Sequence, residues 1–257
     1  MIAFRDVHKA FGAPASPKPV LRGFSLEVRD GETLVLIGYS GTGKSVALKH
    51  VVGLLQPDQG AVEVDGRVVH QLDRPGLTAL RAEIGYVFQF AALFDSMTVG
   101  DNVAMGLVRR GLPREEIRTR VADALALVEL PGTEGRYPAE LSGGMRKRVG
   151  LARAIALEPR YLLYDEPTTG LDPVTAAVID RLMVRARERL GVTAIVVTHD
   201  MRSAYAVGDR IAMLLDGQVR QVGTVAEIQR TPDPEVRRFI EGRPDPAPET
   251  AAMELPA

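Results

Sequence analysis

The sequence has 257 residues, of which 46% are hydrophobic and 25% charged, and it contains no cysteine. This composition is typical of a large globular domain, and the lack of cysteine excludes disulfides, thiolate metal sites and cysteine nucleophiles. Because 32 Lys and Arg are balanced by 33 Asp and Glu, the net charge of −1 gives no overall field that would attract nucleic acid or an anionic membrane. The N-terminal residues lack the apolar core of a signal peptide, and no apolar run approaches the ~20 residues of a transmembrane helix.

Short runs of aliphatic and β-branched residues recur along the chain and predict strands. Several are apolar on both faces, as in a parallel sheet that helices cover. These runs are residues 33–38, 84–89, 161–166, 193–199 and 210–215. Asp216 and Gly217 follow the last run and predict a hairpin turn at the periphery of the sheet.

Apolar residues at spacings of three and four predict helices between these strands. One such pattern runs from Ile117 to Val128 after Pro113, which a first helical turn tolerates. A second begins at Pro173 and continues to Leu190, where Gly191 is expected to end the helix. Strands that alternate with helices predict an α/β fold with a mostly parallel core sheet.

The same patterns predict how the chain is divided. We expect one domain over residues 1–241, with a core of residues 1–89 and 160–241 and a helical subdomain of residues 90–159. Peripheral antiparallel strands are expected beside the core sheet. Residues 242–257 are rich in proline and show no periodicity, so a disordered tail is expected there.

Residues 38–45, with the sequence GYSGTGKS, fit the phosphate-binding pattern G-x-x-x-x-G-K-[S/T] between a predicted strand and a helix. Glycines in this loop let main-chain N–H groups face phosphates, the lysine reaches the β- and γ-phosphates, and the serine ligates Mg²⁺. A glycine-rich turn before a helix is the alternative, but the flanking elements favour a nucleotide site. The expected ATP-binding residues here are Gly38, Tyr39, Ser40, Gly41, Thr42, Gly43, Lys44, Ser45 and Val46.

Asp165 and Glu166 end the buried run YLLYDE, at the sheet edge where such folds bind ligands. We expect Asp165 to hold Mg²⁺ and Glu166 to orient and deprotonate the attacking water. A carboxylate pair that caps the next helix is the alternative.

Two other polar residues end predicted strands. His199 has either a polar role near the γ-phosphate or a structural one, and Asp200 beside it is expected to cap the following helix. Gln89 is either an ordinary strand-end amide or a sensor of Mg²⁺ and water.

These motifs, together with LSGGM at residues 141–145 and TTGLD at residues 168–172, resemble the motifs of ABC-transporter ATPase subunits in order and spacing. The resemblance covers residues 2–240 and implies the fold of a P-loop NTPase and the hydrolysis of ATP with Mg²⁺. It also implies that LSGGM completes the ATP site of a second copy across a head-to-tail dimer. The residues placed against the partner's ATP in this way are Ser142, Gly143, Gly144, Met145 and Asp172.

Further roles follow from the resemblance. Phe11 resembles the aromatic residue that stacks on adenine, with an ordinary buried strand residue as the alternative. Gln89 matches the loop that joins core and helical subdomain on the side where the permease docks. The implied catalytic residues are Lys44, Glu166 and His199, and the implied Mg²⁺ ligands are Ser45, Gln89 and Asp165. Two positions differ from many relatives: Val46 replaces a hydroxyl residue and Met145 replaces glutamine.

The segments around these motifs are similar to the Mla (Mkl) branch, the ATPases of MCE-associated phospholipid transporters. That branch implies a permease, an MCE-domain lipid-binding subunit and a place on the cytoplasmic face of the bacterial inner membrane. A solute-importer ATPase, such as one for amino acids, is the alternative, since its motifs are nearly identical.

A non-transport ABC ATPase that acts on nucleic acid is an alternative of a different class. Such proteins usually carry long coiled-coil or zinc-binding insertions, which this sequence lacks. The basic run Arg146-Lys147-Arg148 is interpreted as a solvated polar helix face, so no nucleic-acid partner is expected.

Overall fold

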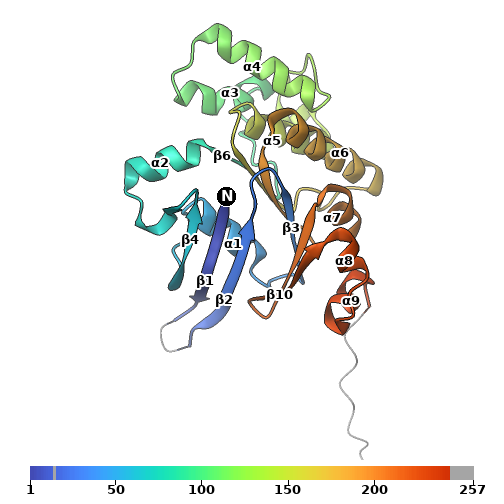
Figure 1. Cartoon of the computed structure of the whole chain (residues 1–257). Coiled ribbons are helices and arrows are strands. Elements are labelled where there is room, and N and C mark those ends of the chain that lie inside the picture. The colour runs from blue at the N-terminus through green and yellow to red at the C-terminus, as the bar shows by residue number, and fades with distance from the viewer. Residues whose placement is uncertain (14–15, 244–257) are drawn as a thin grey trace, which may run out of the picture.

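A six-stranded sheet forms the centre of the computed structural model, which describes residues 1–13 and 16–243 (Figure 1). Adjacent strands pair in parallel except at one edge, where the last two are antiparallel. The order across the sheet is β10 (Gln218–Thr224), β9 (Arg210–Leu215), β3 (Thr33–Ile37), β8 (Thr193–Val197), β7 (Tyr161–Asp165) and β6 (Ile84–Val87). Every residue of β3, β7 and β8 is buried, so the prediction of a mostly parallel, covered sheet is confirmed.

A second, antiparallel sheet lies beside the core. Its order is β2 (Lys18–Val28), β1 (Ile2–Phe11), β4 (Gln59–Val64) and β5 (Arg67–Val68). Helix α1 (Lys44–Val51) is buried between the two sheets, with Ala47, Leu48 and Val51 in the shared apolar cluster. The expected peripheral antiparallel strands thus form a sheet of their own, which fixes the position of α1.

The core sheet packs on both faces because side chains alternate along its strands. Val35 and Ile37 of β3 belong to one buried cluster, and Leu34 and Leu36 belong to the cluster that contains α1. The first cluster continues into the helices at the top of Figure 1. The core strands, whose carboxyl ends carry the loops of the site, are therefore held between two packed apolar layers.

The helical region contains α3 (Val99–Arg109), α4 (Arg114–Leu127), the 3₁₀ turn η2 (Pro138–Glu140) and α5 (Gly143–Ile155). Pro113 is the residue before α4, so the helix begins one position later than the sequence pattern suggested. The fixed φ of proline suits this boundary position. Residues 90–159 remain our predicted subdomain, although their apolar side chains share one buried cluster with the core sheet.

Four short helices and one long one complete the described part of the chain. They are α2 (Arg74–Ala82) after the 3₁₀ turn η1 (Val69–Gln71), α6 (Pro173–Leu190), α7 (Met201–Val207), α8 (Val225–Gln229) and α9 (Pro234–Ile240). Helix α6 begins at Pro173 and ends at Gly191, whose φ is 64°, as predicted. The predicted disordered tail falls almost wholly on residues 244–257, which lie outside the described residues.

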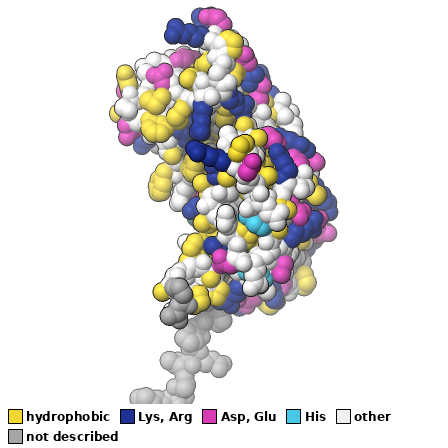
Figure 2. Space-filling view, turned by 90° about the vertical axis from the view of Figure 1, so that its left-hand side faces the viewer, with side chains coloured by type: hydrophobic (Ala, Val, Ile, Leu, Met, Phe, Trp, Pro, Cys, Tyr) yellow, Lys and Arg dark blue, Asp and Glu magenta, His cyan; other side chains and the backbone are white. Residues whose placement is uncertain are grey.

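Charged and apolar groups are mixed on the surface. Acidic and basic side chains lie next to each other on much of the face in Figure 2, as the near-equal totals lead one to expect. Among residues 1–13 and 16–243, no helix combines the length and the apolar character needed to cross a bilayer.

Candidate functional site

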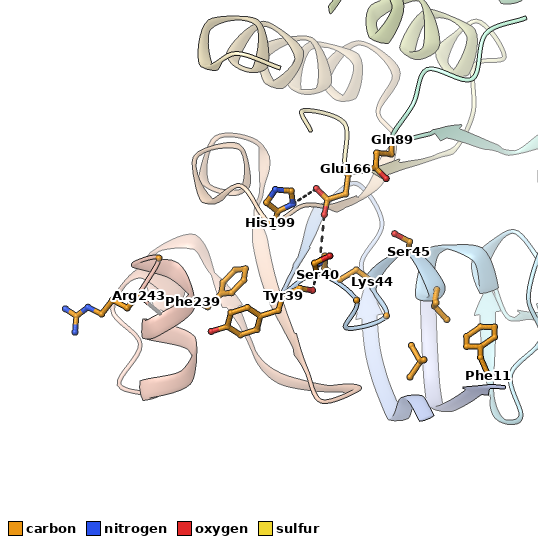
Figure 3. Close-up of a pocket in the computed structure, with 15 residues that line it drawn as sticks. Phe11, Tyr39, Ser40, Lys44, Ser45, Gln89, Glu166, His199, Phe239 and Arg243 are labelled. Atoms are coloured by element: carbon orange, nitrogen blue, oxygen red, sulfur yellow. Dashed lines mark hydrogen bonds and ion pairs between the residues drawn. The ribbon is translucent and has the colours of Figure 1, made fainter. Parts of the chain in front are cut away.

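A cavity of about 910 Å³ opens beside the glycine-rich loop at the carboxyl ends of the core strands (Figure 3). Most of residues 39–46 line it, together with Phe11, Gln89, Glu166 and His199. These residues come from β1, the loop before α1, the first turn of α1 and the segments after β6, β7 and β8. The structure thus gathers, around one cavity, candidate residues that lie as far apart in the sequence as Phe11 and His199.

The loop before α1 is built to face an anion. Gly43 has a φ of 106°, and a Cβ atom there would lie 2.8 Å from a methyl carbon of Val20, so glycine is needed. Helix α1 begins at Lys44 without a side-chain cap. Its first main-chain N–H groups can therefore donate to a phosphate, and the helix dipole adds partial positive charge.

Lys44 folds back across this loop. Its ammonium donates to the carbonyls of Gly38 and Tyr39 at 2.7 and 2.9 Å and lies 3.9 Å from Oε1 of Glu166. The side chain is only 6% exposed. Burial lowers the pKa of Lys44, while the carboxylates of Glu166 and Asp165 act in the opposite direction. A phosphate in the cavity would supply the anionic partner that the buried ammonium lacks at hydrogen-bond distance.

Glu166 occupies a constrained position after β7. Its φ of 51° lies in the left-handed region, and its N–H donates to the carbonyl of Val197 at 2.9 Å. Oε2 accepts a hydrogen bond from the hydroxyl of Thr169 at 3.0 Å and lies 2.8 Å from Nδ1 of His199. The alternative that the acidic pair caps the next helix is wrong, because Asp172 caps α6.

Asp165 and Ser45 form the second polar group of the site. The hydroxyl of Ser45 donates to Oδ1 of Asp165 at 2.6 Å, and Tyr86 donates to Oδ2 at 3.0 Å. Burial, with Asp165 nearby, raises the pKa of Tyr86, so Tyr86 remains a donor. Residues 1–13 and 16–243 contain no cluster of three or more His, Cys, Asp or Glu that could hold a metal ion. The hydroxyl and carboxylate oxygens still suit Mg²⁺, which takes few protein ligands when phosphates and water complete its shell.

Phe11 and Val46 occupy different environments. The Phe11 ring is 41% exposed at the end of β1, and the ammonium of Lys9 lies 5.7 Å from its centroid. The alternative that Phe11 is an ordinary buried strand residue is therefore wrong. Val46 packs its side chain against the apolar cluster around α1, so its main-chain N–H is the donor it can offer a phosphate.

Three contacts of the site were not predicted from the sequence. Thr169 holds Glu166 and Tyr86 holds Asp165, as described above. In addition, the ring of Tyr39 packs edge-on against Phe239 of α9, with 5.0 Å between centroids. Tyr86 lies within the predicted strand of residues 84–89 and Thr169 within TTGLD, so a hydroxyl group close to the site could be seen in each segment of the sequence. Nothing local indicates Phe239, because it lies some two hundred residues away along the chain.

The LSGGM segment lies outside this cavity. Ser142 caps α5 by accepting from the N–H of Met145 at 3.2 Å. A Cβ atom on Gly143 would meet nothing within 4 Å, whereas one on Gly144 would lie 2.5 Å from Cγ2 of Thr175. Among the described residues that line the cavity, none comes from residues 141–145, and Asp172 is not among them either.

The basic run after LSGGM is only in part the solvated polar face that was predicted, because Arg146 is exposed whereas Lys147 and Arg148 are half-buried. Arg146 donates to the carbonyl of Leu141 at 2.8 Å, and Arg148 donates to that of Glu129 at 3.1 Å. Lys147 donates to the carbonyls of Pro167 and Thr169. Each cation has a main-chain acceptor because α5 packs beside loops whose carbonyls have no helical partner.

Comparisons with known proteins agree with this geometry. A family model described as "ABC transporter" matches residues 21–169. The chain is 40% identical to a methionine import ATP-binding protein of Xylella fastidiosa over 241 residues, which cover 93% of this chain and 72% of that protein. It is 43% identical to a sulfate/thiosulfate import ATP-binding protein of Caulobacter vibrioides over 236 residues, which cover 90% and 67% of the two chains.

Solved structures resemble the fold closely. A dimeric ATP-binding cassette in a post-hydrolysis state with ADP and Pi superposes with a TM-score of 0.81 at 34% identity, covering 88% of this chain and 99% of that one. A component of an ABC transporter complex of Clostridium perfringens gives a TM-score of 0.81 at 31% identity, with 94% of each chain covered.

Proposed function

Because this chain belongs to the ATP-binding subunits of ABC transporters, we propose that two copies form a head-to-tail dimer and power a bacterial solute importer. The family membership makes the chain an ATP-hydrolysing transporter subunit. The dimer, the roles of individual residues and the transported substrate belong to the proposal.

One observation supports the proposed dimer. The cavity holds Lys44, Glu166 and His199, but the anion-binding start of α5 lies elsewhere on the same chain. Ser142 and Gly143 are exposed there, with no bulk over Gly143. A helix start with free space at its first residue suits a phosphate that arrives from outside the chain. A second copy, turned head to tail, would bring its own bound ATP to this position.

The chemistry follows from the side chains around Glu166. Lys44 and the N–H groups of α1 bind the phosphates, and Phe11 offers its exposed ring to the adenine. Glu166 accepts the proton of the attacking water as the water oxygen bonds to the γ-phosphorus, the bond to the β–γ bridging oxygen breaks and ADP leaves with that oxygen. His199 and Thr169 hold Oε2, so that Oε1, whose ion pair with Lys44 is long at 3.9 Å, can accept from this water.

Mg²⁺ fits beside the phosphates through Ser45 and Asp165, with Gln89 on the cavity wall as a further ligand. When bound, it would neutralise charge on the phosphate oxygens. The Ser45 hydroxyl donates to Oδ1 of Asp165. This hydrogen bond already holds both oxygens at one place.

The proposed substrate is a small solute. Relatives named for methionine import and for sulfate/thiosulfate import cover most of the chain, and they support import better than lipid transport. Phospholipid transport of the Mla type is the second candidate, because Met145 and the segments around LSGGM resemble that branch. The MCE-domain subunit belongs to this second candidate alone.

The proposal places the chain on the cytoplasmic face of the inner membrane, bound to permease subunits. Aromatic side chains beside Gln89 support a docking surface there: Phe88, Phe90 and Phe94 are 42%, 79% and 51% exposed. Purification of the tagged chain from its own membranes, with identification of bound subunits, tests the proposal. A permease with a solute-binding protein is expected. An MCE protein with bound phospholipid would replace import by lipid transport, and salt-sensitive binding to duplex DNA without a permease would overturn a transport role.

A further inference from the structure

Lys147 makes a contact that the proposed function does not use. It lies in α5, five residues after the capping residue Ser142. Its ammonium donates to the carbonyl of Pro167 at 2.9 Å and to that of Thr169 at 2.6 Å. Burial lowers the pKa of Lys147, and the carboxylate of Glu166 acts in the opposite direction. A half-buried ammonium that spans two carbonyls fixes the distance between α5 and this loop.

The loop that Lys147 holds is the one that carries Glu166. Thr169 donates its N–H to the carbonyl of Glu166 at 3.3 Å and its hydroxyl to Oε2 at 3.0 Å. The carbonyl that Lys147 binds and the hydroxyl that holds Glu166 thus belong to the same residue. A shift of α5 relative to Thr169 would change the orientation of the Glu166 carboxylate.

A second contact joins the same two segments. Gly144 packs so closely on Thr175 of α6 that a Cβ atom would lie 2.5 Å from Cγ2. The hydroxyl of Thr175 donates to Oδ2 of Asp172 at 2.5 Å. The start of α5 therefore touches both ends of the segment between Glu166 and α6. It cannot move far without moving that segment, since packed side chains leave little room.

We infer that Lys147 is a positioning residue that couples the two ATP sites of the dimer. On one side α5 receives the partner's γ-phosphate at Ser142 and Gly143, and on the other Lys147 holds the loop of its own Glu166. The binding of ATP in one site thereby sets the geometry of the base in the other. The inference rests on the proposed head-to-tail dimer. It adds the contacts that connect, within each chain, the start of α5 to the loop that carries Glu166.

The test compares ATP hydrolysis by the purified full chain as a function of ATP concentration. Lys147→Met keeps the apolar stem and removes the donors, and Lys147→Arg restores them. Arg148→Met is the matched control, because Arg148 is the next residue of α5 and binds carbonyls away from Glu166. Lys147→Gln, which retains one donor group, serves if the methionine variant does not fold.

Coupled sites should give the wild type a Hill coefficient that approaches the ~2 sites of the dimer. Lys147→Met should lower it to about 1, while ATP binding to the dilute single chain stays at the wild-type level. Lys147→Arg should restore the cooperativity and Arg148→Met should retain it. A wild-type Hill coefficient in Lys147→Met, or in Lys147→Gln where the methionine variant does not fold, would overturn the inference, and so would an equal loss in Arg148→Met. If the wild type shows no cooperativity and Glu166→Gln forms no dimer with ATP, the dimeric function itself fails, and the inference with it.

Discussion

Oε2 of Glu166 lies 2.8 Å from Nδ1 of His199 and accepts the Thr169 hydroxyl at 3.0 Å, which leaves Oε1 facing the phosphate loop. Lys44 is the nearest cation on that side, at 3.9 Å. The carboxylate is thus held through hydrogen-bond-length contacts at Oε2, while Oε1 makes only the longer ion pair with Lys44. A general base needs this arrangement, because the oxygen that takes the proton must be oriented without being occupied.

Replacement of the base tests this arrangement. Glu166→Gln should lower the rate of phosphate release at least about 100-fold, because the amide cannot accept the proton of the water. ATP binding should be retained, since Lys44 and the loop before α1 are unchanged. Glu188→Gln on the exposed face of α6 is the control. Near-normal turnover in Glu166→Gln would remove Glu166 from the role of base.

Replacement of Gly143 distinguishes a role in the ATP site of a partner subunit from a role in the folding of its own chain. Within the chain a Cβ atom at this position meets nothing within 4 Å, so Gly143→Ala should leave the melting temperature unchanged. Against a partner's phosphate the methyl group would block close approach, and hydrolysis should fall about 100-fold, as when an anion-binding donor is lost.

The control for Gly143→Ala is Gly135→Ala, at another exposed glycine with free space around it. This variant should hydrolyse ATP normally. Full activity in Gly143→Ala would mean that no phosphate approaches the start of α5.

Met145 is expected to tolerate glutamine. Its main-chain N–H, which any residue supplies, donates to the Ser142 hydroxyl, while the side chain packs partly buried on the apolar cluster of the helical region. The rate for Met145→Gln should therefore stay within about tenfold of the wild type in a steady-state assay. Complete loss would assign a direct function to the methionine side chain.

The buried carboxyl of Asp180 is expected to make the free energy of unfolding depend on pH. Oδ2 of this buried carboxyl accepts from Ser203 at 3.0 Å. Burial raises the pKa of Asp180 from 3.8 to about 6, against the opposing hydrogen bond from Ser203. Because the folded-state pKa is the higher one, ionisation costs stability, and the loss develops between about pH 4 and pH 6. Asp180→Asn removes this cost.

The free energy of unfolding of Asp180→Asn should accordingly exceed that of the wild type by up to about 3 kcal/mol at pH 7 and by little at pH 4. Urea titrations at the two pH values measure this difference. Asp123→Asn, at an exposed position of α4, should show no such gain. A difference between Asp180→Asn and the wild type that does not change with pH would contradict the assignment.

Local signals were sufficient for much of the fold. Pro173 and Gly191 marked both ends of α6, and Asp216 with Gly217 marked the turn between β9 and β10. Each of these residues favours its position through its own φ and ψ preferences, so the helix ends and the turn could be predicted without knowledge of tertiary contacts. The antiparallel sheet around β1 was expected only in outline, because its pairing joins segments distant along the chain.

The same distinction applies to the site. The loop from Gly38 to Ser45 and the pair Asp165 and Glu166 have patterns that their chemistry requires. Most of that loop and Glu166 line one cavity with Phe11, Gln89 and His199, and Asp165 accepts a hydrogen bond from Ser45 beside it. The contacts of Lys147 and Phe239 depend on how helices pack, which a basic run or a lone aromatic residue does not reveal.

The composite site between two copies is the central claim, and a mixture of two inactive variants tests it most directly. Lys44→Ala damages the phosphate loop and Ser142→Ala damages the start of α5, so each variant alone should be nearly inactive. In a mixed dimer, one site combines the intact Lys44 of one subunit with the intact Ser142 of the other. ATP hydrolysis by the mixture should therefore rise clearly above that of either variant alone. A mixture no more active than its components would contradict a site shared between subunits.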